Sequence, residues 1–152
     1  MELNTKKGNV MAKNENTIIT VQVTVNAPVE KVWNHWTRPE SIKEWNSASE
    51  DWHTPRAEND LRNGGSFNYR MEARDGSMGF DFGGTYDNII PGEQIDFTIA
   101  DGRKVQVNFT DKGNKTEVIE SFEAEGVHSL DLQRAGWQSI LDNFRKFTEE
   151  AG

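Results

Sequence analysis

The chain has 152 residues, with 17 Lys and Arg against 25 Asp and Glu, which gives a formal net charge of -8. This length suits a single domain with a real core, because such a chain buries roughly 70% of the surface that it exposes when unfolded. The acidic balance and the lack of any Lys or Arg run exclude nucleic acid as a partner, and the absence of cysteine excludes disulfides, thiolate metal sites and thiol nucleophiles.

The first 16 residues are polar and rich in Asn and Lys, and they contain Met11, an alternative start to Met1. We expect them to form a disordered arm ahead of one folded domain over residues 17–150. The chain has no apolar stretch typical of a signal peptide and no run of about 18 apolar residues. The sequence therefore predicts a cytoplasmic protein without membrane insertion.

The first elements are a strand and two short helices. Residues 17–25 alternate apolar and polar side chains in the period of a half-buried strand. Pro28 suits the first turn of a helix, and Pro39 ends that helix near residue 37 because the residue before a proline avoids the helical region. A second short helix is predicted over residues 40–45.

The next part of the chain indicates strands joined by tight turns. Pro55 makes the segment 51–57 irregular, since proline cannot donate to a ladder and belongs on an edge or at a bulge. The Gly83-Gly84 pair suggests a second bulge. Alternating segments at 67–71, 78–86, 95–99, 105–109 and 116–124 are separated by glycine-containing turns, and such local connections imply an antiparallel sheet.

The segment 126–150 is the longest predicted element. Ser129, or His128 before it, can cap its start. Its large apolar residues recur at spacings of three, four and seven, as on one face of a helix, and are Leu130, Trp137, Ile140, Leu141, Phe144 and Phe147. A curved antiparallel sheet of six or seven strands that wraps around this helix covers that face. The predicted fold is therefore α+β, a helix-grip arrangement with two short helices after the first strand.

Several motifs in this order resemble a known superfamily. They are NAPVEKVW at 26–33, RPESIKEW at 38–45, GGSF at 64–67 and Gly136-Trp137. The chain resembles the SRPBCC or START-like superfamily over residues 17–149. Within it, the chain is similar to the branch named after the activator of the ATPase of the 90-kDa heat-shock chaperone.

The resemblance implies a cavity between the sheet and the long helix. Members of the superfamily include lipid carriers, plant hormone receptors, aromatic cyclases and oxygenase domains, so the shared feature is the cavity and not one activity. The resemblance does not extend to a chaperone partner, because the activator that names the branch carries an additional N-terminal domain for which this chain has no room. We expect a monomer or weak dimer whose partner is a small hydrophobic ligand.

Glu120 is the first candidate site residue. It shares its strand parity with Val118 and Phe122, so the pattern directs a carboxyl group towards an otherwise apolar concave face. A buried carboxylate requires a partner or a raised pKa, and both are commoner at functional sites than elsewhere. The structural alternatives are a residue that reaches solvent at a sheet edge, or an ion pair with Arg56 or Arg70.

The other candidates for the cavity lining come from three regions. Trp45, Met71, Phe82 and Trp137 are rings and a thioether predicted near Glu120. Leu130 and Gln133 on the first half of the long helix are predicted to close that end, with the Gln133 amide available for a ligand's polar group. Trp52, His53 and Arg56 lie where START-like folds commonly open their cavity.

The sequence predicts no metal, cofactor or covalent nucleophile. His35, His53 and His128 stand far apart, and no helical HxxxH or HxxE pair occurs. Neither a phosphate-binding glycine loop nor a GxSxG elbow is present. Three interpretations follow: a non-enzymatic binding protein for a small apolar or amphipathic ligand, a cyclase or hydratase that uses Glu120 and His53, and a chaperone-associated interaction module.

Overall fold

The computed structural model describes residues 17–151. The arm predicted at 1–16 lies outside the described residues. Within 17–151, no helix is long and apolar enough to cross a membrane.

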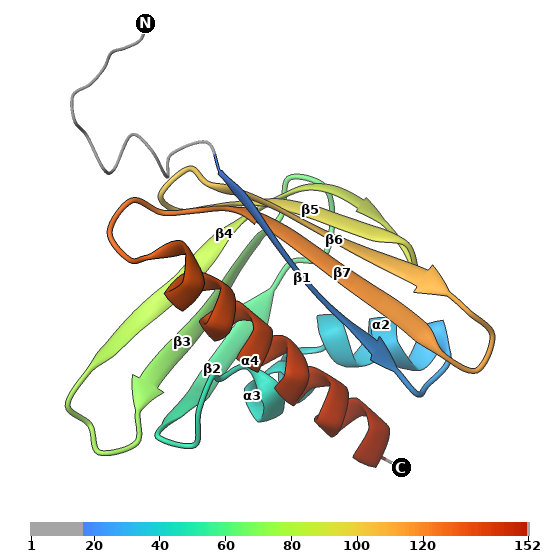
Figure 1. The fold of residues 1–152 in the computed structure, drawn as a ribbon, viewed down its shortest axis with the longest axis horizontal. Coiled ribbons are helices and arrows are strands. Elements are labelled where there is room, and N and C mark those ends of the chain that lie inside the picture. The colour runs from blue at the N-terminus through green and yellow to red at the C-terminus, as the bar shows by residue number, and fades with distance from the viewer. Residues whose placement is uncertain (1–16, 152) are drawn as a thin grey trace, which may run out of the picture.

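Seven strands form one antiparallel sheet in the order β1-β7-β6-β5-β4-β3-β2 (Figure 1). The strands are β1 (Ile18–Val25), β2 (Trp52–Asn59), β3 (Ser66–Ala73), β4 (Gly79–Ile90), β5 (Gln94–Ile99), β6 (Lys104–Asp111) and β7 (Thr116–Glu123). Consecutive strands from β2 to β7 are neighbours, as their short turns require, whereas β1 joins at the far edge beside β7. This arrangement confirms the predicted antiparallel sheet.

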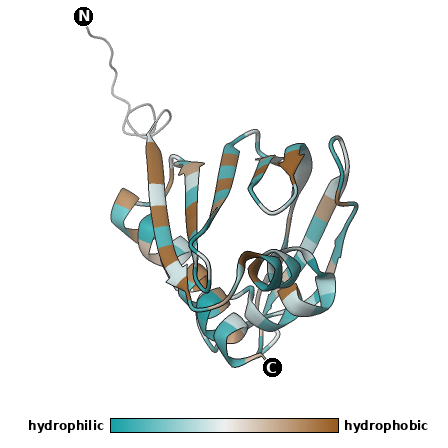
Figure 2. Cartoon of the chain, turned by 90° about the vertical axis from the view of Figure 1, so that its right-hand side faces the viewer, coloured by the Kyte–Doolittle hydropathy of each residue, from teal (hydrophilic) through white to brown (hydrophobic). Residues whose placement is uncertain are grey.

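Three helices complete the fold: α2 (Val29–Thr37), α3 (Pro39–Trp45) and α4 (Leu130–Glu150). The two short helices follow β1, and α4 crosses the concave side of the sheet (Figure 1). The sheet curves around its interior, with apolar bands alternating along its strands (Figure 2). The predicted α+β helix-grip fold is confirmed.

The long helix begins at Leu130, which confirms Ser129 as its cap and shortens the predicted segment 126–150 at the start. Ser129 is the N-cap, and its hydroxyl oxygen accepts a hydrogen bond of 3.1 Å from the Leu132 backbone N–H. Residues 126–129 instead belong to the loop after β7. The apolar face of α4 is buried at Leu141 and Phe144, which are both 0% exposed.

The two predicted strand irregularities have different outcomes. Pro55 lies on the edge strand β2, in a shift of register between His53 and Arg56, as predicted. The prediction of a bulge at Gly83-Gly84 was wrong, because the register shift of β4 lies between Tyr86 and Asn88. Gly84 is glycine for another reason: a Cβ atom there would lie 2.1 Å from the Thr98 carbonyl oxygen on the adjacent strand.

The helix α4 contacts the sheet unevenly. It packs along β1 and against α2 and α3, whereas its contacts with β3 and β4 are sparse. A compact aromatic cluster fills the centre, where the rings of Trp36 and Trp45 lie 5.0 Å apart and both meet the ring of Phe144. Space therefore remains between α4 and the β3–β4 half of the sheet.

Candidate ligand-binding cavity

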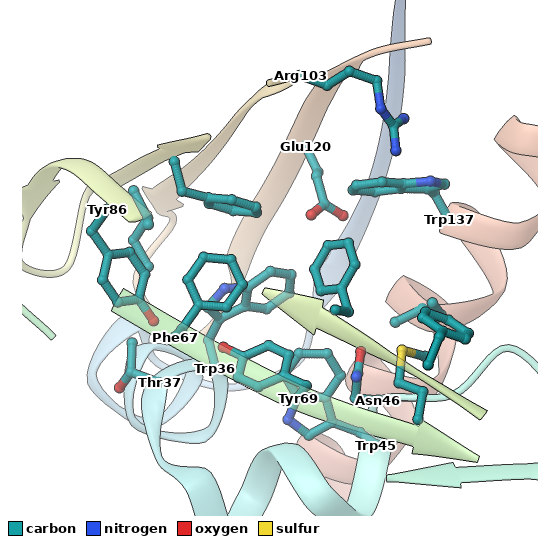
Figure 3. Close-up of a pocket in the computed structure, with 16 residues that line it drawn as sticks. Trp36, Thr37, Trp45, Asn46, Phe67, Tyr69, Tyr86, Arg103, Glu120 and Trp137 are labelled. Atoms are coloured by element: carbon teal, nitrogen blue, oxygen red, sulfur yellow. The ribbon is translucent and has the colours of Figure 1, made fainter. Parts of the chain in front are cut away.

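A cavity of about 290 Å³ lies between α4 and the concave face of the sheet. Its wall draws side chains from all three helices, from β3, β4, β5 and β7, and from the turn before β6 (Figure 3). Aromatic and aliphatic groups predominate. The lining residues are Trp36, Thr37, Trp45, Asn46, Phe67, Tyr69, Met71, Phe80, Phe82, Tyr86, Ile95, Phe97, Arg103, Glu120, Trp137 and Ile140.

The rings of the wall are fixed by contacts with one another. Phe67 lies at the centre of one group, with ring centroids 5.2 Å from Tyr86 and 5.1 Å from Phe97. The indole of Trp137 stacks on Phe122, with centroids 3.9 Å apart and an interplanar angle of 12°. Such packing holds the cavity surface in shape without a ligand.

Glu120 is the acidic group of this wall, and its carboxyl points into the cavity (Figure 3). Its register partners are Val21 on β1 and Val107 on β6, and its neighbours on the same face of β7 are Val118 and Phe122. These four side chains are at most 2% exposed, and Glu120 itself is 7% exposed. The carboxyl therefore lies in an apolar row that crosses three strands.

The carboxyl of Glu120 makes no hydrogen bond or ion pair with any residue in the range 17–151. Burial away from water disfavours its charged form and raises the pKa of Glu120 from 4.5 to about 8. The carboxyl of Glu120 is therefore mostly protonated at neutral pH. An acid in this state can donate a hydrogen bond, or it can lose its proton to balance a positive charge.

Four other polar side chains of the wall are hydrogen bonded within the protein. Their partners are the Trp33 carbonyl for Thr37, the Thr54 hydroxyl for Asn46, the Asn59 amide for Tyr86, and Asp101 with the Glu123 carbonyl for Arg103. The Glu120 carboxyl differs from these four groups because it is buried without a hydrogen bond to residues 17–151.

Five of the ten candidate residues come together in the cavity wall: Trp45, Met71, Phe82, Glu120 and Trp137. The structure does not place Leu130 and Gln133 there. Gln133 is buried against the loop before α4, where its side chain accepts from the Glu125 N–H at 2.8 Å and donates to the His128 carbonyl at 2.9 Å. The Gln133 side chain thus joins the first turn of α4 to the preceding loop and does not face the cavity.

Trp52, His53 and Arg56 also lie outside the wall, on the edge strand β2. Trp52 packs against Phe80, with ring centroids 5.9 Å apart, and the structure does not bring His53 and Glu120 together. The alternative ion pairs of Glu120 are not formed either. Arg70 is paired with Glu72 at 2.9 Å, and Arg56 is exposed.

The sequence interpretation missed Trp36, Ile140 and Arg103 as wall residues. Ile140 lies on the predicted apolar face of the helix and lines the cavity one turn beyond Trp137. Helical spacing offered a signal, because residues three apart share a face. Arg103 follows the predicted Asp101-Gly102 turn, and its direction depends on the ion pair with Asp101. Among residues 17–151, no group of three or more His, Asp or Glu could hold a metal ion.

Comparisons with known proteins agree on the family. The sequence profile described as Activator of Hsp90 ATPase homolog 1-like protein matches residues 26–149. The solution structure of an AHSA1-like protein from Aeromonas hydrophila is 42% identical, with a TM-score of 0.83 over 88% of this chain and 92% of that chain. The search among curated proteins returned no match.

Two further solved structures share the fold. A protein from Cytophaga hutchinsonii is 50% identical, with a TM-score of 0.76 over 86% of this chain and 91% of that one. CalU16 from Micromonospora echinospora is 20% identical, with a TM-score of 0.64 over 88% of this chain and 76% of that one, and shows the fold alone. The chain therefore belongs to the Activator of Hsp90 ATPase homolog 1-like family, within the SRPBCC superfamily.

Proposed function

We propose that this protein binds a small amphipathic molecule in the cavity beneath α4, without transforming it. The observation that carries the proposal is an aromatic cavity with one buried carboxyl group that has no partner among residues 17–151. Ligand sites are typically concave and apolar, with a few polar groups that fix orientation. The SRPBCC fold commonly binds ligands in such a cavity, which supports the proposal.

The size of the cavity limits the ligand. At about 290 Å³ it lies at the lower end of the volumes of small-molecule sites, which are roughly 300–1,000 Å³. A compact molecule of one to three rings fits this volume better than a long-chain lipid does. Its apolar part would contribute about 25 cal/mol for each Å² removed from water.

The geometry favours binding over the cyclase or hydratase alternative. That alternative requires Glu120 and His53 to face each other across a substrate, whereas His53 lies on β2 outside the wall. The interaction-module alternative requires a sealed core, whereas a cavity lies beneath the helix.

The proposal is tested by filling the cavity with a side chain. N-phenyl-1-naphthylamine, which is uncharged at neutral pH, fluoresces more strongly when it enters an apolar site. We expect the wild-type protein to bind it and Ile140→Trp to bind it at least about tenfold more weakly, because an indole at position 140 occupies the cavity.

Leu132→Trp is the matched control, since it adds an indole to the same helix at a position that is 58% exposed. This variant should bind the probe as the wild type does. Circular dichroism and thermal unfolding establish that both variants fold. Equal affinity of the wild type and Ile140→Trp would contradict binding in this cavity.

A further inference from the structure

The carboxyl group of Glu120 is the feature that an apolar ligand leaves unexplained. Val21 and Val107 flank it across the strands, and Val118 and Phe122 flank it along β7, so an apolar side chain would suit the row. A carboxyl in such surroundings loses its hydration without a hydrogen bond from the protein in return. The position is therefore suited to a polar group that arrives with a ligand.

The surroundings of this carboxyl favour one sign of charge. Figure 3 shows the Glu120 carboxyl beside the Trp137 indole, which is itself stacked on Phe122, two residues further along β7. Aromatic faces carry negative electrostatic potential and attract ammonium groups, most strongly at tryptophan. A carboxylate and the faces of several aromatic rings line this cavity, and both attract cations. The protein's net charge of -8 also favours the approach of a positively charged ligand.

The cationic side chain that the cavity wall contains among residues 17–151 does not meet this preference. Arg103 is the cationic side chain of the described wall, and it is held by Asp101 at 2.9 Å and by the Glu123 carbonyl at 3.1 Å. The wall's other titratable side chains are Tyr69 and Tyr86, whose pKa values burial raises further above neutrality. A positive charge beside Glu120 would then come from outside residues 17–151.

We infer, resting on the proposed function, that the ligand carries a protonated amine that pairs with Glu120 beside Trp137 while its apolar remainder fills the ring-lined cavity. The ligand class is a small aryl or cycloalkyl amine. Binding converts the carboxylic acid into a carboxylate: the ammonium group enters and the proton of Glu120 leaves to solvent.

This exchange makes the affinity depend on pH in a characteristic way. Burial raises the pKa of Glu120 to about 8, so below that pH each bound amine displaces one proton. The affinity then rises about tenfold for each pH unit between pH 6 and pH 7. The buried tyrosines do not change their charge in this interval, because burial raises their pKa values. The side chains that face the carboxyl from β1, β6 and α4 do not titrate, and they are Val21, Val107, Trp137 and Ile140.

The test compares 3-phenylpropylamine with 3-phenylpropan-1-ol, which has nearly the same shape and no charge. Isothermal titration calorimetry measures the affinity for each compound at pH 6 and pH 7. At pH 7 the protein should bind the amine at least about tenfold more tightly than the alcohol. Between pH 6 and pH 7 the affinity for the amine should rise about tenfold, whereas the affinity for the alcohol should not change. Glu120→Gln should abolish both the preference and the pH effect while retaining alcohol binding. Glu117→Gln, on the opposite face of β7, should retain both.

The outcomes separate this inference from the proposed function. Equal affinity for amine and alcohol, or an amine affinity that does not change with pH, would overturn the amine inference and leave cavity binding in place if N-phenyl-1-naphthylamine still binds. If N-phenyl-1-naphthylamine binds but neither phenylpropyl compound does, the amine inference is overturned and the proposed function is not. Failure of all three compounds to bind would overturn the proposed function together with it.

Discussion

Glu120 occupies a position where the fold itself calls for an apolar residue. Both of its cross-strand partners are valine, and the carboxyl is left neutral because the surroundings do not stabilise a charge. The free energy of unfolding therefore depends on pH through this residue. An acid whose pKa is higher in the folded state than in the unfolded state binds more protons when folded, so unfolding becomes easier as the pH rises from about 4.5 to about 8.

We expect the wild-type protein to lose on the order of 3 kcal/mol of unfolding free energy through Glu120 between pH 5 and pH 7. Above pH 8 this loss levels off, because the carboxyl is ionised in both states. Urea unfolding of the ligand-free protein at the two pH values measures the change. Glu120→Gln should remove this part of the dependence of the unfolding free energy on pH, since the glutamine amide does not titrate.

Glu117→Gln serves as the control, because it removes an acidic group from the opposite face of the same strand. Its stability should follow the wild-type dependence on pH. If the slopes of the wild type and Glu120→Gln coincide, Glu120 is not held in its neutral form by burial.

At the scale of the elements, two glycines have opposite roles. Gly84 allows β4 and β5 to approach each other, since a Cβ atom there would lie 2.1 Å from the Thr98 carbonyl oxygen. Gly136 lies in the interior of α4, with nothing within 4 Å of a Cβ atom. The same substitution is therefore expected to have opposite signs at the two positions.

Gly84→Ala should destabilise the protein by about 3 kcal/mol or more, because the strands must separate to admit the methyl group. Gly136→Ala should stabilise it by about 1 kcal/mol, because alanine has the higher helix propensity and loses less backbone entropy. Chemical unfolding of both variants measures the difference. A neutral effect of Gly84→Ala would show that the sheet adapts at this contact.

Local patterns in the sequence were sufficient to predict the elements. Alternation gave each strand, and the spacing of Trp137, Leu141 and Phe144 gave the long helix, because both periods are properties of adjacent residues. Ser129 was predictable as the cap of α4, whereas the bond between Gln133 and the loop at Glu125 joins residues eight apart and follows no local period. The bulge at Tyr86 depends on how β4 pairs with β5, which no single segment encodes.

At the scale of the whole molecule, α4 divides the sheet into two unequal halves. It packs closely on β1, while the cavity lies between it and much of β3 and β4, where Trp137 meets Phe82 with ring centroids 6.3 Å apart. The β3–β4 hairpin carries Met78 at 65% and Phe80 at 47% exposure, so this end of the sheet has little cover. Sparse packing of this kind lowers the free energy of local opening.

A ligand that packs beneath α4 against both Phe82 on β4 and Trp137 on α4 should stabilise this half selectively. We expect N-phenyl-1-naphthylamine to slow hydrogen exchange in residues 74–82 and 137–140 more than in β1 and β7, as followed by mass spectrometry of peptides. The probe should produce no such change in Ile140→Trp. Equal slowing throughout the chain would instead indicate a general stabilisation of the fold.

Only part of the cavity was predictable from the sequence. Strand parity placed Glu120 and Phe82 on the concave face, since alternation fixes which side a residue takes. Which side chains meet across the cavity depends on the curl of the sheet and on the rotation of α4. These features brought Ile140 and Trp36 into the wall and left His53 and Gln133 outside it.

The row Val21, Glu120 and Val107 also has a mutational consequence. Codons for glutamate and valine differ only in their middle base, so single-base mutation can supply a valine that completes the row and relieves the cost of a buried acid. Drift under selection for a stable fold alone would favour that change. A glutamate at this position is what selection for a charge-bearing ligand would maintain, and a codon-120 library enriched only for thermal stability should shift towards valine.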